Sequence, residues 1–237
     1  MIRIILLLFS LLLFPASATA TTYHVATTGL DANSGTIGSP FLTIQHAVDI
    51  AVAGDTILIR TGSYKTFVIA GKNGTSVAPI TIKNYPAETA TIDCALGGYQ
   101  SPPYYVRIDI TNSSYLVLDG LTITNTAAII ATLRALSFGN PTDEATMDAY
   151  IADASFQANT GNCGIAFAST GIHHITIQNV VMSNSAGLVG GDGDDITILN
   201  NTVTRGLYPF AVYAFYSNGS RWLIRGNWIE EQTYGMH

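Results

Sequence analysis

The chain has 237 residues, of which 48% are hydrophobic and only 11% are charged, and its formal net charge at pH 7 is −6. Globular proteins usually carry about 25% charged residues, so this composition favours a stacked β structure with polar but uncharged turns. With only 10 Lys and Arg residues and no basic patch, the sequence argues against a nucleic-acid partner. The length is sufficient for one elongated domain.

The first 20 residues have the pattern of a secretory signal peptide. Arg3 supplies a positive start, Ile4 to Phe14 is apolar, and small residues suited to cleavage follow at Ala16 to Ala20. The apolar run is shorter than the roughly 20 residues that span a bilayer. We therefore expect residues 1–20 to be cleaved, leaving residues 21–237 without a transmembrane segment. The mature protein is expected to be secreted, periplasmic or attached to the cell surface.

The beginning of the mature chain predicts a strand, a helix and a second strand. The strands are expected at Tyr23 to Val25 and Thr56 to Ile59, and the helix between them at Pro40 to Ala53, with Gly54 as its C-terminal cap. The helix is predicted from apolar residues spaced at i, i+3, i+4 and i+7, namely Ile44, Ala47, Val48 and Ala51. A stack of coils needs a cover over its first coil, and this helix is placed to provide it.

A short block of two alternating strands recurs between Ser114 and Glu231. Its four copies are centred on Gly120, Asn179, Asn200 and Gly226, at intervals of 59, 21 and 26 residues. Repeats of this length made of short strands predict a solenoid. Alternation places Leu118, Leu121 and Ile123 on one face, while the central Gly or Asn tolerates a left-handed backbone. We predict an all-β parallel β-helix, with two or more coil lengths and an insertion inside the 59-residue interval.

The insertion is predicted at residues 127–171. Within it, Asp143 to Ala154 has the spacing of a helix. Long excursions from a solenoid lie either on a binding face or over a bare flank, and the sequence does not separate these alternatives. The repeat continues to Met236 without a polar cap, so we expect the solenoid to extend further in a longer protein.

Several segments of the chain resemble a known superfamily. They are Tyr23–Gly29, Gly35–Thr36, Ser39–Ala47, Ala53–Ile57, Ala78–Pro86 and Tyr115–Leu121. They resemble the opening of secreted right-handed parallel β-helix proteins of the pectate-lyase-like superfamily, nearest to family 9 polysaccharide lyases. The resemblance implies a right-handed β-helix with an N-terminal capping helix. It does not fix the activity, because the superfamily contains lyases, hydrolases, epimerases and non-enzymes.

The densest polar cluster is the acidic run of residues 190–195. Its carboxylates, Asp192, Asp194 and Asp195, are candidate ligands for Ca²⁺, which prefers several oxygen donors. The resemblance implies that such an ion binds a substrate uronate, whose C5 proton a Lys or Arg then removes before β-elimination. An ordinary Asp- and Gly-rich turn is the alternative interpretation. The order of these residues also differs from the acidic cluster of family 9 lyases.

The candidate catalytic bases are the arginines that follow the acidic run. These are Arg205, Arg221 and Arg225, and we select Arg205 and Arg225 as the catalytic candidates. The lysines are confined to the early coils, at Lys65, Lys72 and Lys83, so the lysine base of family 9 lyases has no evident counterpart.

An aromatic-rich tract supplies candidate sugar-binding residues. Its members are Tyr208, Phe210, Tyr213, Phe215, Tyr216, Trp222 and Trp228. Exposed aromatic rings stack on apolar faces of sugars, and we select Tyr213, Tyr216 and Trp222 for substrate binding. Alternation along the strands predicts that at least half of the tract is buried.

Two further pairs of residues are candidates for a metal site or a crosslink. His173 and His174 are adjacent, and neighbouring side chains of a strand point to opposite faces, so they are predicted to be turn residues rather than a metal pair. Cys94 and Cys163 are 69 residues apart. Two independent buried thiols are the favoured interpretation, with a disulfide in an oxidising compartment as the alternative.

The sequence thus predicts a secreted carbohydrate-active β-helix, with Ca²⁺-dependent lyase activity on an acidic, uronate-containing polysaccharide as the leading function. The alternative is a non-catalytic polysaccharide-binding or cell-surface β-helix, which the absence of a suitable lysine favours. A polygalacturonase-like glycoside hydrolase is a further alternative, because Asp194 and Asp195 resemble the paired aspartates of that family. The accompanying Asn-Thr-Asp, Gly-His-Gly and Arg-Ile-Lys motifs of that family are missing.

Overall fold

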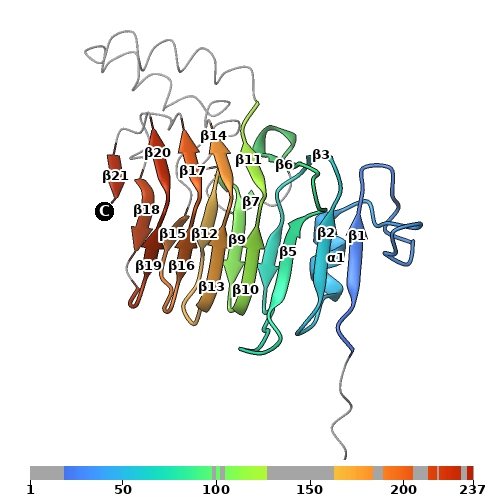
Figure 1. The fold of residues 1–237 in the computed structure, drawn as a ribbon, viewed down its shortest axis with the longest axis horizontal. Helices are drawn as coiled ribbons and strands as arrows, with labels where there is room; N and C mark the ends of the chain where they lie inside the picture. The colour runs from blue at the N-terminus through green and yellow to red at the C-terminus, as the bar shows by residue number, and fades with distance from the viewer. Residues whose placement is uncertain are drawn as a thin grey trace, which may run out of the picture.

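The computed structural model describes residues 19–97, 100–101, 105–126, 163–183, 189–204, 213–217, 219–230 and 234–236. Most of the predicted signal peptide, the predicted helix Asp143–Ala154 and the candidate base Arg205 lie outside these residues. In the described part, short strands stack side by side along the long axis of the molecule (Figure 1). This is the parallel β-helix that the repeat predicts.

Three parallel sheets form the solenoid, and each complete coil contributes one strand to each sheet. Sheet I contains β1 (Thr22–Val25), β2 (Thr56–Ile59), β5 (Ile80–Asn84), β10 (Ser114–Asp119), β13 (His173–Gln178), β16 (Thr197–Leu199) and β19 (Leu223–Arg225). Sheet II contains β3 (Gly62–Tyr64), β6 (Ala90–Asp93), β11 (Thr122–Thr124), β14 (Val181–Ser183), β17 (Thr202–Thr204) and β20 (Trp228–Glu230). Sheet III contains β4 (Val68–Ala70), β9 (Ile108–Thr111), β12 (Ile165–Phe167), β15 (Val189–Gly191), β18 (Tyr213–Ser217) and β21 (Tyr234–Met236). A short antiparallel pair, β7 (Gln100–Ser101) and β8 (Tyr105–Val106), lies beside this stack.

The register places equivalent residues of successive coils above one another. Leu118 pairs with Ile82 on one side and with Ile177 on the other, and Ile177 pairs in turn with Ile198. All four side chains are at most 1% exposed. Burying such an aliphatic side chain contributes about 1.5–3 kcal/mol, so the aligned columns inside the coils are the main source of stability. The predicted alternation is confirmed.

The 59-residue interval of the repeat contains one coil and not two or more. β10 pairs directly with β13, so Gly120 and Asn179 belong to neighbouring coils. The ladder of sheet I continues without a gap from β10 to β13, and sheet III continues from β9 to β12. The predicted insertion also ends too late, because β12 lies inside the range 127–171 and continues sheet III.

The predicted capping helix is present but shorter than the sequence pattern suggested. α1 spans Ile44–Ile50 rather than Pro40–Ala53, and Thr43 is its N-cap, with a side chain that accepts a hydrogen bond from the first turn. The C-cap residue is Ala51, so the prediction of Gly54 as the cap is wrong; Gly54 belongs to the following turn. The four pattern residues are all at most 2% exposed, namely Ile44, Ala47, Val48 and Ala51.

α1 covers the outer edge of β4, where sheet III begins. The Gln45 side chain accepts a hydrogen bond from the backbone N–H of Val68 (2.8 Å) and donates one to its carbonyl (3.1 Å). One amide side chain thereby replaces the strand that this edge lacks. Lys72 donates to the carbonyls of Asp49 (2.5 Å) and Ala51 (3.2 Å) at the C-terminal end of the helix, where a cation is favoured. As predicted, the helix caps the first coil.

The corner between sheets I and II is made by residues with a left-handed backbone. The φ angles are 72° at Gly120, 54° at Asn179, 54° at Asn200 and 69° at Gly226. These are the four anchors of the repeat, and glycine and asparagine adopt this conformation at the lowest energetic cost. We call them the glycine–asparagine column.

A buried asparagine ladder lies next to this column. Asn201 is 1% exposed; its side chain accepts from the backbone N–H of Val180 (2.8 Å) and donates to the carbonyl of Ile177 (3.1 Å). Asn227 repeats the arrangement one coil later, donating to the carbonyl of Ile198 (3.0 Å) and accepting from Asn201 (2.9 Å). These amides satisfy backbone groups that the turn leaves without a strand partner.

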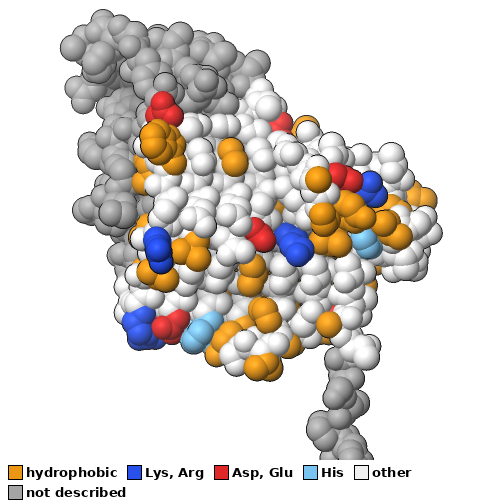
Figure 2. All heavy atoms as spheres, in the orientation of Figure 1, with side chains coloured by type: hydrophobic (Ala, Val, Ile, Leu, Met, Phe, Trp, Pro, Cys, Tyr) orange, Lys and Arg blue, Asp and Glu red, His pale blue; other side chains and the backbone are white. Residues whose placement is uncertain are grey.

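The outer surface agrees with the low charge of the sequence. Figure 2 shows that charged side chains are few and scattered on the face seen in Figure 1, among hydrophobic side chains and a larger area of backbone and uncharged polar atoms. Within the described residues, no helix is long and apolar enough to cross a membrane.

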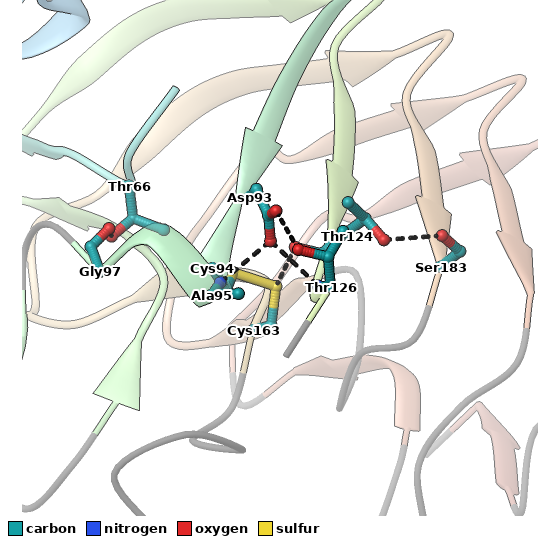
Figure 3. Close-up of a disulfide and its surroundings, with 9 residues drawn as sticks. All are labelled: Thr66, Asp93, Cys94, Ala95, Gly97, Thr124, Thr126, Cys163 and Ser183. Carbon is teal, nitrogen blue, oxygen red and sulfur yellow. Dashed lines mark hydrogen bonds between the residues drawn. A yellow bond between two sulfur atoms is a disulfide. The ribbon is translucent and has the colours of Figure 1, made fainter. Parts of the chain in front are cut away.

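Cys94 and Cys163 form a disulfide (Figure 3), so the favoured interpretation as separate thiols is wrong. Cys94 follows β6 and Cys163 precedes β12. These positions fall on adjacent coils, which brings them together despite a sequence separation of 69 residues. A crosslink that closes a loop of this size stabilises a fold by about 4 kcal/mol in the chain-entropy model.

Asp93 holds the chain at the same corner. It is 5% exposed, and its Oδ1 accepts hydrogen bonds from the backbone N–H groups of Ala95 and Thr126, both at 3.0 Å. Its Oδ2 accepts from the hydroxyl of Thr126 (Figure 3). Thr126 immediately precedes residues 127–162, and Cys163 immediately follows them. The two residues that flank positions 127–162 are therefore both bonded to the dipeptide Asp93–Cys94.

Candidate functional site

A second column of left-handed residues lies where the strands of sheet I begin. It consists of Tyr115, Asp195, His174 and Arg221, with φ angles between 52° and 57°. Each residue stands five positions before an anchor of the repeat, so the four stack on successive coils. We call them the side-chain column. A left-handed conformation costs a residue with a Cβ atom roughly 1–2 kcal/mol, and such strain tends to gather at functional sites.

A groove of about 300 Å³ opens beside the side-chain column, at the small end of ligand-pocket volumes. Its floor is the outer face of sheet I, and its side is the loop before β5. The lining residues are Thr75, Ser76, Pro79, Tyr115, Leu116, Val117, His174, Thr176, Asp195 and Thr197. Figure 2 shows basic, acidic and histidine side chains next to one another on this face of the molecule. The groove therefore combines threonine hydroxyls, an aromatic ring and charged groups.

Three rings meet at one end of this groove. Tyr115 and His174 are stacked, with centroids 4.5 Å apart and planes inclined by 21°. His173 meets Tyr115 edge-on at 5.6 Å, and the Nδ1 atoms of His173 and His174 lie 2.8 Å apart. Opposite orientations were predicted for the two histidines. Their rings converge because His174 has a left-handed backbone (φ 56°), which breaks the alternation of a strand.

The charged groups of the column form a fixed network. Asp195 receives two hydrogen bonds from Arg221, from Nε at 2.5 Å and from Nη2 at 2.8 Å. Asp194 accepts from the backbone N–H of Ser220 at 2.8 Å and from its hydroxyl at 2.6 Å. The Ser220 hydrogen bonds lower the pKa of Asp194, and the Arg221 hydrogen bonds lower the pKa of Asp195. Both carboxylates are therefore ionised at neutral pH.

The three predicted calcium ligands do not converge. Asp192 is exposed, Asp194 is engaged by Ser220, and Asp195 is engaged by Arg221. In the part of the chain that the structure describes, no three His, Cys, Asp or Glu side chains are grouped to hold a metal ion. A guanidinium bound to one of the carboxylates also opposes a cation. This arrangement does not fit Ca²⁺, and we assign no step to that ion.

The predicted catalytic arginines are not at the groove. Arg225 pairs with Leu199, four residues along the sheet from Asp195, or about 13 Å at 3.3 Å per residue. Arg205 lies outside the described residues. Arg221 is the arginine that the fold places in the side-chain column, where it holds Asp195.

The structure does not place the predicted sugar-binding aromatic residues at the groove. Trp222 packs against the core, lies 5.8 Å from Phe167 and donates its indole N–H to the carbonyl of Gly193 (2.7 Å). It therefore serves packing. Tyr213 and Tyr216 belong to β18, and their side chains fall outside the described part. The aromatic residue at the groove is Tyr115, which the sequence analysis missed although its five-residue offset from Gly120 recurs in every copy of the repeat.

A capped stack of parallel coils, each contributing one strand to each of three sheets, defines the class of β-helical solenoid proteins. Residues 23–202 match the family model described as "Pel9A-like, right handed beta helix region". The chain therefore belongs to the Pel9A-like right-handed β-helix family, in agreement with the superfamily that its N-terminal motifs indicate.

Three known proteins are similar to this chain. Uncharacterized protein YwoF of Bacillus subtilis is 30% identical over 194 residues, covering 76% of this chain and 41% of YwoF. Pectate lyase PEL9 of Emericella nidulans is 42% identical over 83 residues, covering 34% of this chain and 20% of the lyase. The crystal structure of pectate lyase Pel9A matches with a TM-score of 0.60 at 17% identity, over 89% of this chain and 48% of Pel9A; that likeness shows the fold. The chain spans less than half the length of each.

Proposed function

We propose that this protein is a secreted polysaccharide-binding β-helix that holds its glycan in the groove of sheet I. The observation that supports this most strongly is the convergence of Tyr115, His174 and Asp195 around one groove on sheet I. The signal-peptide pattern at the N-terminus supports a location outside the cell, where polysaccharides are accessible.

The groove has the two kinds of surface that a sugar ring requires. Tyr115, Pro79 and Val117 offer apolar contact for the C–H face of a pyranose. Thr176, Thr197 and the ion pair of Asp195 surround that surface with hydrogen-bonding groups. Because the Asp195 carboxylate is already oriented by Arg221, little conformational entropy is lost when it accepts a sugar hydroxyl.

A second candidate function is cleavage of a uronate-containing polysaccharide by β-elimination. It is favoured by the 42% identity with a pectate lyase over 83 residues and by the family itself. The described residues at the groove do not form the predicted calcium site. We therefore place lyase chemistry, with its acidic substrate and its Ca²⁺ dependence, behind glycan binding as a proposal for this chain.

The proposal is tested by native affinity electrophoresis of the full chain in gels containing neutral or acidic polysaccharides. Tyr115→Ala is expected to weaken retention roughly tenfold, a change of about 1.4 kcal/mol in binding free energy. Trp228→Ala is the matched control, because Trp228 is an exposed aromatic (64%) away from the groove. Equal retention of both variants would contradict the proposed site. Release of unsaturated uronate ends, followed by ultraviolet absorbance, would establish the lyase instead.

A further inference from the structure

We propose that the groove of sheet I selects an uncharged pyranose unit and discriminates against a uronate at the same position. This inference rests on the proposed glycan binding and names the class of sugar that the groove takes. The sequence suggested an acidic polysaccharide, and this inference differs from that suggestion. An acidic substrate belongs to the lyase hypothesis alone.

The charges at the groove are unbalanced toward the negative. Asp195, which lines the groove, is held by one guanidinium, that of Arg221. The same turn carries two further carboxylates, Asp194, which is held by Ser220, and the exposed Asp192. A uronate would therefore bring its own negative charge next to an excess of carboxylates, and like charges in such proximity repel.

The groove also has more free hydrogen-bond acceptors than free donors next to Asp195. Arg221 already uses Nε and Nη2 on Asp195 and Nη1 on the Ser220 hydroxyl. Each carboxylate oxygen of Asp195 keeps a further lone pair. The groove thus offers acceptors to hydroxyl donors, while its guanidinium has few N–H groups left for an incoming carboxylate. Hydroxyl-rich neutral sugars match this pattern, and a uronate does not.

The backbone of the column shows that these side chains are held at an energetic cost. Asp195 and Arg221 have φ angles of 55° and 57°. The same step of the repeat is occupied on other coils by Tyr115 and His174, so the fold does not require an aspartate or an arginine there. In the glycine–asparagine column, by contrast, the left-handed positions of this fold are filled by Gly and Asn, which adopt that conformation at low cost. Retaining an oriented carboxylate and its arginine under strain is expected where they contact a ligand.

The experiment compares sugars that differ only at C6. Methyl galactoside is paired with methyl galacturonoside, and methyl glucoside with methyl glucuronide, each titrated into the full chain at pH 7 and low salt while NMR follows the ring signals of Tyr115. We expect at least one neutral member to bind roughly tenfold more tightly than its uronate partner. Added salt should reduce the ratio of the neutral-sugar affinity to the uronate affinity, because salt screens exposed charges.

Charge variants then identify the source of the selectivity. In the variants Asp195→Asn and Asp194→Asn, the affinities for the neutral sugar and for its uronate partner are expected to differ by no more than about threefold, because each substitution removes one repelling charge. Asp49→Asn, on α1 at the N-terminal end, is the matched control and should leave the ratio unchanged. A uronate that binds wild-type protein as well as or better than its neutral partner overturns this inference and leaves glycan binding intact. Absence of binding by every sugar, together with no retention in the polysaccharide gels, overturns the proposed function and this inference together.

Discussion

The two corners that flank sheet I have the same backbone conformation but different side chains. The glycine–asparagine column and the side-chain column both have φ angles near +50° to +70°. The first is built from Gly120, Asn179, Asn200 and Gly226, which adopt this conformation at little cost. The second uses Tyr, His, Asp and Arg at equivalent steps of the repeat. The comparison separates what the solenoid needs, a left-handed bend, from what the groove needs, which is side chains at that bend.

The largest expected effect concerns the buried ladder beside the glycine–asparagine column. Asn201→Ala removes the partners of Val180, Ile177 and Asn227 in the interior. Leaving such groups unpaired should lower the free energy of unfolding by about 3 kcal/mol. Chemical denaturation followed by circular dichroism measures this. The adjacent Asn200→Ala, at an exposed anchor, is the control and should lose about 1 kcal/mol; equal losses would show that the ladder is not the stabilising element.

The next effect separates backbone strain from steric conflict at two glycines. At Gly226 an added Cβ would lie 2.3 Å from Oδ1 of Asn200, whereas at Gly120 the nearest atom, in the Asn84 side chain, is 3.6 Å away. Both have strongly positive φ angles. Gly120→Ala should therefore lower the free energy of unfolding by about 1 kcal/mol, and Gly226→Ala by about 2 kcal/mol because crowding adds to the strain. The same denaturation curves test this, and a larger loss at Gly120 would contradict it.

The fold was largely predictable from the sequence because the repeat carries it directly. Alternating apolar residues and the anchors Gly120 and Asn200 identify the coils, and the helical spacing from Ile44 identifies the cap. The position of Asn179 one coil after Gly120 was not predictable, since an excursion between β11 and β12 lengthens the interval without adding a coil. The disulfide of Cys94 followed from the same stacking, which sequence separation conceals.

The candidate site was predictable only in part. The acidic run directed attention to Asp194 and Asp195. Asp195 lines the groove, and Asp194 precedes it in the same turn. Their partners were not apparent, because Ser220 and Arg221 come from the next coil and become neighbours only through stacking. Tyr115 escaped because a single tyrosine in a strand carries no chemical signal of its own. Its shared offset with Asp195, measured from the anchors, is the pattern that would have identified it.

The smallest expected effect is a change in the acid sensitivity of Asp194, which adjoins the side-chain column. Hydrogen bonds from Ser220 lower the pKa of Asp194 in the folded protein. A lowered folded pKa contributes stability above the unfolded pKa, near 3.9, and this contribution is lost as pH falls through the lower folded value. Ser220→Ala should raise the pKa of Asp194 and reduce this loss.

Carboxyl carbon NMR during an acid titration measures that pKa directly. Ser34→Ala, in a distant loop, is the control and should leave the titration of Asp194 unchanged. An unaltered pKa in the Ser220 variant would show that the Ser220 hydroxyl does not lower the pKa of Asp194.

The most direct test makes the side-chain column resemble the glycine–asparagine column. All four of its residues, Tyr115, His174, Asp195 and Arg221, are replaced together by asparagine. Asparagine tolerates the left-handed backbone, so the variant should keep the β-sheet circular dichroism spectrum and an equal or higher Tm. It should lose retention on polysaccharide gels that retain the wild-type chain. A variant that still binds glycan with wild-type affinity would contradict the assignment of this column as the binding site. Loss of the fold would show that the four side chains are structural.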